Sequence, residues 1–238
     1  MLFLCIAFSI IVPYLICSIN PAIIVTKLKS GEDIRKLGSG SGGVTNVLRT
    51  QGKTAAVIVL FSDIFKGVIS ILLVRYFTLF FFPEYELNYF SDYSRDWLIP
   101  FENSRNVTLC LWIGSLAAVL GHCFPLYYRF KGGKAVLVTV TTGMVIGWLA
   151  PLIALSIFIA IVALTRYVSL GSVIAAVCYP VCVWLIGTFV WVSPHAYIGV
   201  IFTSVIAVIL VFMHRQNIIR LLNKTEKKLG QSERKKNG

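Results

Sequence analysis

The sequence predicts an all-α, polytopic integral membrane protein, and two features of its composition carry that prediction. Of its 238 residues, 57% are apolar or aromatic and 13% are charged, whereas soluble domains average about 45–50% and about 25%. Each membrane span needs about 20 apolar residues, so the apolar residues suffice for roughly seven spans. Few residues are left for a soluble domain, and we expect residues 1–238 to form a single membrane-embedded domain.

Seven apolar runs follow one another along the chain, and each is expected to form a transmembrane helix. Their approximate limits are residues 2–25, 55–82, 109–126, 135–150, 152–165, 172–190 and 195–213. The first run lacks the basic start and the cleavage site of a secretory signal, so we expect it to be a retained span. The short fourth and fifth runs are separated at Pro151, because proline interrupts a helix.

The distribution of basic residues predicts the orientation. The chain has 22 Lys and Arg against 10 Asp and Glu, a net charge of +12. Seven spans place residues 26–53, 127–134, 166–171 and 214–238 on one side, and these segments hold 18 of the 22 basic residues. The loop expected on the other side, residues 83–108, has a net charge of −3. By the positive-inside rule the N-terminus lies outside and the C-terminus lies in the cytoplasm.

The first polar motif is the glycine-rich stretch of residues 34–49. Its glycines can turn successive backbone N–H groups toward one point, and such a nest binds anions. Arg35, Lys36 and Arg49 bracket the stretch with positive charge. Its candidate phosphate ligands are Gly38, Ser39, Gly40, Ser41, Gly43, Thr45 and Asn46. A flexible linker is the alternative, and a dinucleotide fingerprint is excluded because no strand precedes the glycines.

The second polar motif lies between the third and fourth spans. Gly132, Gly133 and Lys134 lead into the start of a helix, an arrangement that suits a phosphate group. His122, at the end of the preceding span, is either a helix-end histidine bonded to a carbonyl or a functional group.

The third polar motif follows the last span. His214 and Asn217 share one face of a continuing helix, which an amphipathic interfacial helix alone would not require. Ser169, in the turn between the fifth and sixth spans, can join the same site. Asp63 and Lys66, one turn apart inside the second span, are expected mainly to neutralise each other.

Together these motifs resemble the bacterial acyl-phosphate:glycerol-3-phosphate acyltransferase family of the PlsY type over nearly the whole chain. The matching stretches are residues 33–49, 62–67, 121–134, 166–170 and 214–222. The resemblance implies a seven-helix enzyme of the bacterial cytoplasmic (inner) membrane with a site that faces the cytoplasm. It would transfer a fatty acyl group from acyl phosphate to the 1-hydroxyl of glycerol 3-phosphate, and lysophosphatidic acid and phosphate would be the products.

The resemblance also implies roles for individual residues. Ser39, Arg49 and Lys134 would hold phosphate groups, while His214 and Asn217 would orient the acceptor or the leaving group with help from Ser169. Acyl phosphate has a good leaving group and the sequence has no Ser-His-Asp set, so we expect direct transfer without an acyl-enzyme. The expected partners are both substrates, membrane lipid and an enzyme that forms acyl phosphate. Nucleic acid, a metal and a cofactor are not expected.

The chain departs from the family pattern in a few places, which are residues 41–44, Ala135, Gly171 and Lys224. The charged motif residues are retained, so we expect an active enzyme. The main alternative is a membrane carrier for an organic phosphate or another anion. Carriers often bind at the membrane midplane between inverted repeats, but we find no repeat, and the polar motifs gather at one interface.

Overall fold

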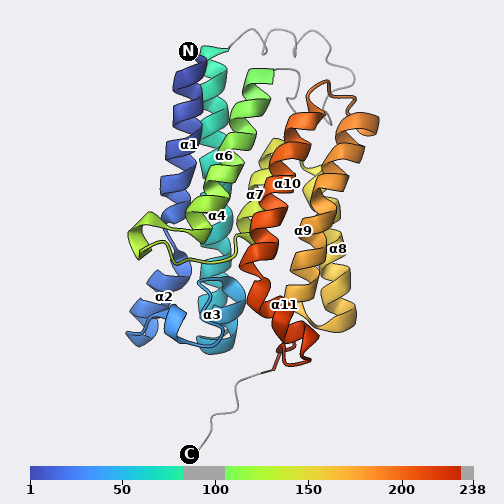
Figure 1. The fold of residues 1–238 in the computed structure, drawn as a ribbon. Helices are drawn as coiled ribbons and strands as arrows, with labels where there is room; N and C mark the ends of the chain where they lie inside the picture. The colour runs from blue at the N-terminus through green and yellow to red at the C-terminus, as the bar shows by residue number, and fades with distance from the viewer. Residues whose placement is uncertain (83–104, 232–238) are drawn as a thin grey trace, which may run out of the picture.

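The computed structural model describes residues 1–82 and 105–231, and every regular element in these ranges is helical. Figure 1 shows long helices running side by side, with the short helices α2, α3 and α11 gathered at one end of the bundle. Most of the expected external loop, residues 83–104, lies outside the described residues, and Arg105 begins a helix.

The first apolar run forms two helices rather than the single span expected over residues 2–25. Helix α1 covers Leu2–Ser18 and α2 covers Pro21–Ser30. The side chain of Asn20 caps α2 by accepting a 3.2 Å hydrogen bond from the Ile23 N–H, and Pro21 occupies the first helical position. Both residues favour a helix start, so they interrupt an otherwise continuous apolar run.

Helices α1, α4 (Lys53–Phe81) and α6 (Arg105–Cys123) pack against one another as one group. Gly121 of α6 lies against the backbone of Tyr14 of α1, and a Cβ at this position would overlap the Tyr14 carbonyl oxygen. Small residues at such contacts let membrane helices approach closely. Figure 1 shows these three helices as neighbours.

The second group consists of α8 (Leu149–Thr165), α9 (Val168–Leu185) and α10 (Ala196–Met213), and α7 (Val136–Ile146) contacts both groups. The expected boundary at Pro151 is wrong, because α7 ends at Ile146 and the chain bends at Gly147. Pro151 lies in the first turn of α8, where its missing N–H costs no helical hydrogen bond. A π-helical turn, Ile186–Val190, extends α9.

Three short elements complete the end of the bundle that carries the motifs. They are the 3₁₀ turn Ile34–Lys36, helix α3 (Val44–Thr50) and helix α11 (Arg215–Leu222). A further 3₁₀ turn, Leu126–Tyr128, follows Pro125 at the end of α6. Arg35 connects the first two motifs because its guanidinium donates to the Tyr128 carbonyl at 2.7 Å and pairs with Asp33 at 2.6 Å. The Arg35 hydrogen bond also holds the pKa of Asp33 below its usual value.

Five helical segments of the described residues are long and apolar enough to cross a membrane. They are Leu2–Ser30, Lys53–Phe81, Arg105–Tyr128, Val168–Val190 and Ala196–Met213, and α7 and α8 are shorter apolar helices. Large apolar side chains such as Phe3, Phe65 and Phe80 are exposed on the outside of the bundle. An apolar outer surface of this extent is typical of lipid contact, and the fold is that of a multi-pass membrane protein.

We expect Gly121→Ala to destabilise the protein by about 1–3 kcal/mol, because the added methyl group overpacks the contact between α1 and α6. The thermal unfolding midpoint of the protein in detergent measures this effect. Ser156→Ala is the control, since its exposed hydroxyl bonds only to Leu152 in its own helix. A Gly121→Ala midpoint equal to that of the control would contradict the close approach.

Candidate active site

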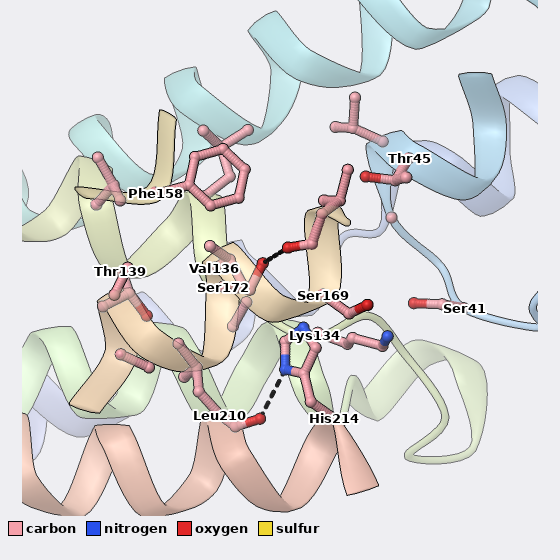
Figure 2. Close-up of a pocket in the computed structure, with 18 of the residues that line it drawn as sticks. Ser41, Thr45, Lys134, Val136, Thr139, Phe158, Ser169, Ser172, Leu210 and His214 are labelled. Carbon is pink, nitrogen blue, oxygen red and sulfur yellow. Dashed lines mark hydrogen bonds between the residues drawn. The ribbon is translucent and has the colours of Figure 1, made fainter. Parts of the chain in front are cut away.

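A cavity of about 370 Å³ opens between the two helix groups and receives side chains from all three motifs. Its polar end is formed by α3, the segment before α7, the start of α9 and α11, and Figure 2 shows Ser41, Lys134, Ser169 and His214 around this end. The rest of the wall is mainly apolar and comes mostly from α7 to α10, while Asp63 of α4 and His122 of α6 also line the cavity. Among the residues lining this part are Val140, Ala154, Leu155, Phe158, Ala175 and Ala176.

Asn46 organises the glycine-rich motif from its centre. Its Nδ2 donates to the Leu37 and Ser41 carbonyls, both at 3.0 Å, and its Oδ1 accepts the Ser39 N–H at 2.9 Å. Asn46 is therefore largely satisfied within the loop, and it fixes the backbone that carries Ser39 and Ser41. Those two serines, with Gly43, Thr45 and Asn46 itself, line the cavity.

Two glycines of this motif shape the loop without lining the cavity. Gly38 and Gly40 have φ angles of 55° and 72°, in the left-handed region that favours glycine. A Cβ on Gly38 would overlap the Asn46 side chain. We expected phosphate contacts from both residues, but neither lines the cavity; Gly38 packs against Asn46 and Gly40 lies near the Arg35 carbonyl.

The N–H groups of the two glycines before α7 are already bonded to backbone carbonyls. The Gly132 N–H donates to the Cys123 carbonyl and the Gly133 N–H to the His122 carbonyl, each at 3.1 Å. The phosphate contacts expected from these two N–H groups therefore have competing partners already in place. Neither residue lines the cavity, whereas Lys134 does. Gly133 packs so closely on the His122 ring that a Cβ would overlap Nε2.

Ala135, one of the expected departures from the family pattern, follows Lys134 directly. Its φ angle is 56°, a left-handed conformation that costs an alanine about 1–2 kcal/mol. This strained position lies in the cavity wall and turns the chain from Lys134 into α7.

His122 belongs to a buried cluster with Asp63 and Lys66. The Lys66 ammonium lies 2.8 Å from Asp63 Oδ1 and 3.0 Å from His122 Nδ1, and it donates to the Ile19 carbonyl at 2.9 Å. The expected pairing of Asp63 with Lys66 is confirmed. The His122 Nδ1 faces an ammonium group and acts as the acceptor, and no hydrogen bond from the ring to a carbonyl is found among the described residues.

A hydrogen-bonded chain joins the second and third motifs at the polar end. The Lys134 ammonium donates to Asn217 Oδ1 at 2.5 Å, and Asn217 Nδ2 donates to Glu226 Oε1 at 2.7 Å. Glu226 Oε1 also accepts the Ser169 hydroxyl at 2.7 Å, and Arg220 Nε donates to Oε2 at 2.7 Å. Sequence reasoning did not find Glu226. Its signal was weak, since it is one acidic residue in a tail rich in lysine and arginine.

Burial and neighbouring charges set the protonation of this polar end. Burial lowers the pKa of Lys134 to about 8; Glu226 opposes that shift, and Arg220 and Arg49 add to it. Burial disfavours the charged form of Glu226, but hydrogen bonds from Arg220, Ser169 and Asn217 outweigh it and leave its pKa below the usual value. The site at neutral pH thus contains a buried carboxylate and a lysine that titrates slightly above neutrality.

His214 is a neutral hydrogen-bonding group in this setting. Burial and the Lys134 charge lower its pKa to about 4, although its bond to the Leu210 carbonyl opposes the shift. Because a carbonyl only accepts, the 2.8 Å contact between Nδ1 and the Leu210 oxygen places the proton on Nδ1. Figure 2 shows this bond. The Nε2 lone pair is then the group that His214 offers as an acceptor.

Arg49 contributes the second cation of the cavity wall. Its Nη2 donates to the Lys227 carbonyl at 3.1 Å, but its buried Nε has no hydrogen-bond partner among the residues that the structure describes. A buried donor without an acceptor is costly, and an anionic oxygen in the cavity would satisfy it.

Comparisons with known proteins give consistent matches over most of the chain. The family model described as Glycerol-3-phosphate acyltransferase matches residues 7–224. The glycerol-3-phosphate acyltransferase of Thermoanaerobacter sp. (strain X514) is 37% identical over 221 residues, which cover 93% of this chain and 94% of the relative. The corresponding protein of Staphylococcus carnosus (strain TM300) is 35% identical over 227 residues, 94% of this chain and 98% of the relative.

Solved structures give the same result. A crystal structure of PlsY (YgiH), an integral membrane glycerol 3-phosphate acyltransferase in its glycerol 3-phosphate form, superposes with a TM-score of 0.73 at 30% identity. The match covers 94% of this chain and 96% of that chain. The lysophosphatidic acid form gives a TM-score of 0.69 at 28% identity. These matches favour an enzyme over the carrier alternative, and the chain belongs to the glycerol-3-phosphate acyltransferase family of membrane acyltransferases.

Proposed function

We propose that this protein transfers a fatty acyl group from acyl phosphate to the 1-hydroxyl of glycerol 3-phosphate. The observation that carries the proposal is the two-part cavity, which is cationic at one end and mainly apolar over the rest of its wall. One substrate has a phosphate and an alkyl chain, and the other has a phosphate and hydroxyl groups. Both phosphates suit the end with Arg49 and Lys134, and the alkyl chain suits the apolar wall.

The residues of the polar end have distinct roles in this proposal. Arg49 and Lys134, with the Ser39 and Ser41 hydroxyls, hold the phosphate groups by charge-assisted hydrogen bonds. The unpartnered Nε of Arg49 gains its acceptor from a phosphate oxygen. The neutral His214 accepts a hydrogen bond from an acceptor hydroxyl through Nε2, and Asn217 orients Lys134.

The transfer itself proceeds without an acyl-enzyme. The 1-hydroxyl oxygen attacks the acyl carbon, the bond from that carbon to the phosphate oxygen breaks, and the hydroxyl proton passes to a phosphate oxygen. Within the described residues, no serine or threonine hydroxyl hydrogen-bonds to a histidine ring, so the arrangement that activates a nucleophilic hydroxyl is absent from them. Positioning and charge stabilisation then supply the catalysis.

We also propose a membrane topology for the chain. The four basic segments meet the cavity's polar end, and α2, α3 and α11 lie at that same end of the bundle in Figure 1. Counting the shorter α7 and α8 as spans gives seven, with the N-terminus outside and the C-terminus in the cytoplasm. The membrane is then the bacterial cytoplasmic (inner) membrane, where an enzyme that forms acyl phosphate would supply the donor.

The donor is tested with purified protein, labelled glycerol 3-phosphate and either palmitoyl phosphate or palmitoyl-CoA. We expect lysophosphatidic acid and an equal amount of phosphate from palmitoyl phosphate. Product from palmitoyl-CoA alone would refute the donor assignment. A labelled acyl-protein adduct that turns over as fast as product forms would refute direct transfer.

We expect Arg49→Ala and Lys134→Ala each to lower kcat/KM by at least about 30-fold, because each leaves a buried phosphate charge without its partner. Steady-state rates with both substrates varied measure the loss. Lys53→Ala is the matched control, since Lys53 is exposed at the same end of the bundle and does not line the cavity. Normal kinetics in either cavity variant would remove that residue from the site.

We expect the KM for glycerol 3-phosphate to rise as the pH increases through about 8. Lys134 has a pKa lowered to about 8, so it is charged below that pH and loses its charge above it. Initial rates between pH 6 and about 9.5 measure this alkaline limb of the pH profile, in which KM rises. Lys134→Arg, which stays charged throughout, should flatten it. An alkaline limb that persists unchanged in Lys134→Arg would assign the titration to another group.

A further inference from the structure

The chain after α11 folds back across the polar end of the site as a strap, defined here as residues 223–231. It is held by backbone contacts at both edges. The Leu229 N–H donates to the Arg166 carbonyl at 2.7 Å, and Arg166 Nη2 returns a bond to the Leu229 carbonyl at 3.0 Å. On the other side, Arg49 Nη2 donates to the Lys227 carbonyl at 3.1 Å. The strap thus connects α3 with the turn between α8 and α9.

Glu226 is the one buried residue of the strap, with 8% of its surface exposed, and every other strap residue is exposed. A carboxylate removed from water must be compensated by hydrogen bonds or opposite charge. Its oxygens accept from Ser169, Asn217 and Arg220, each at 2.7 Å. These three donors come from α9 and α11, so one side chain joins two helices of the site.

We propose that Glu226 is a positioning residue for acyl transfer, which holds Ser169, Asn217 and Arg220 in place and, through Asn217, aims the Lys134 ammonium into the cavity. The Asn217 amide has one orientation in this network, because its Nδ2 faces the Glu226 carboxylate. Its Oδ1 is thereby turned to Lys134. The network is observed, whereas its effect on catalysis rests on the proposed function.

A carboxylate beside a phosphate site has two possible effects, and the geometry distinguishes them. Glu226 could occupy the phosphate position until the substrate displaces it, and its removal would then tighten substrate binding. However, its oxygens are already paired with Arg220 and with two neutral donors, and the strap is anchored on both sides of it. In this arrangement Glu226 positions Lys134 and does not occupy the phosphate position. Removal of the carboxylate should therefore weaken substrate binding.

The charge of Glu226 also acts on Lys134. Among the described residues, four titratable groups face this lysine, namely Glu226 and Arg220 from the C-terminal segment, Arg49 from α3 and His214 from the end of α10. Glu226 is the only one of the four that favours the charged lysine. A variant without the carboxylate should therefore lose the Lys134 charge at a lower pH than the wild type.

The test compares Glu226→Gln and Glu226→Asp with Glu32→Gln, a matched control at an exposed bend of the same end of the bundle. We expect Glu226→Gln to raise the KM for glycerol 3-phosphate by about tenfold or more, with a smaller fall in kcat. The rise of the Glu226→Gln KM with increasing pH should begin at a lower pH than in the wild type. Glu226→Asp keeps the charge and should restore part of both effects, and the control should match the wild type.

Several outcomes would overturn the proposal. A lowered KM in Glu226→Gln would show that the carboxylate competes with the substrate. An unchanged KM and pH profile would show that the carboxylate only anchors the strap to the bundle. If Glu226→Gln does not fold, by its thermal midpoint in detergent, wild-type kinetics in Glu226→Asp together with normal kinetics in Arg220→Gln would overturn it. A wild type inactive with palmitoyl phosphate refutes the donor instead, and the comparison is then run with the donor that works.

Discussion

The hydrogen bond between Lys134 and Asn217 is the interaction on which the site depends. A half-buried ammonium group must have an acceptor, and Asn217 provides it while its own amide donates to Glu226. This contact joins the segment before α7 to the C-terminal part of the chain, which is 83 residues away in the sequence. Glu226 connects the strap to it, and the first turn of α9 joins through Ser169. The polar end of the cavity is thus built by a few charge-assisted bonds.

The helices of this fold could be predicted from the length of the apolar runs, whereas their interruptions could not. Asn20 and Pro21 stop an apolar segment that hydropathy alone extends to residue 25, because the cap is a local hydrogen-bonding feature. Pro151 misled the prediction in the opposite way. Proline breaks a helix interior but is accepted in a first turn, and the bend lies four residues earlier, at Gly147.

The site could be predicted as a meeting of three motifs, but the partner of each residue could not. Gly132 and Gly133 were expected to offer N–H groups to phosphate, and the carbonyls of α6 accept them in the structure. Asn46 was expected to face a ligand, and it mainly braces its own loop. Such partners depend on how the backbone folds in three dimensions. Glu226 is the clearest case, since only the return of the strap gives an isolated acidic residue its three donors.

The boundary between the polar and apolar lining constrains where the reaction can occur. It falls within a few residues on two separate segments, between Lys134 and Val136 and between Leu210 and His214. A donor with a charged head and an alkyl chain fits such a cavity in one direction only, because the reverse would bury phosphate against Phe158 and Ala154. Its acyl carbon adjoins its phosphate, so that carbon must lie at the boundary. The acceptor is polar throughout and stays at the cationic end, where its hydroxyl reaches the same boundary. In the proposed reaction, the division of the cavity therefore brings the reacting atoms together without a nucleophile from the protein.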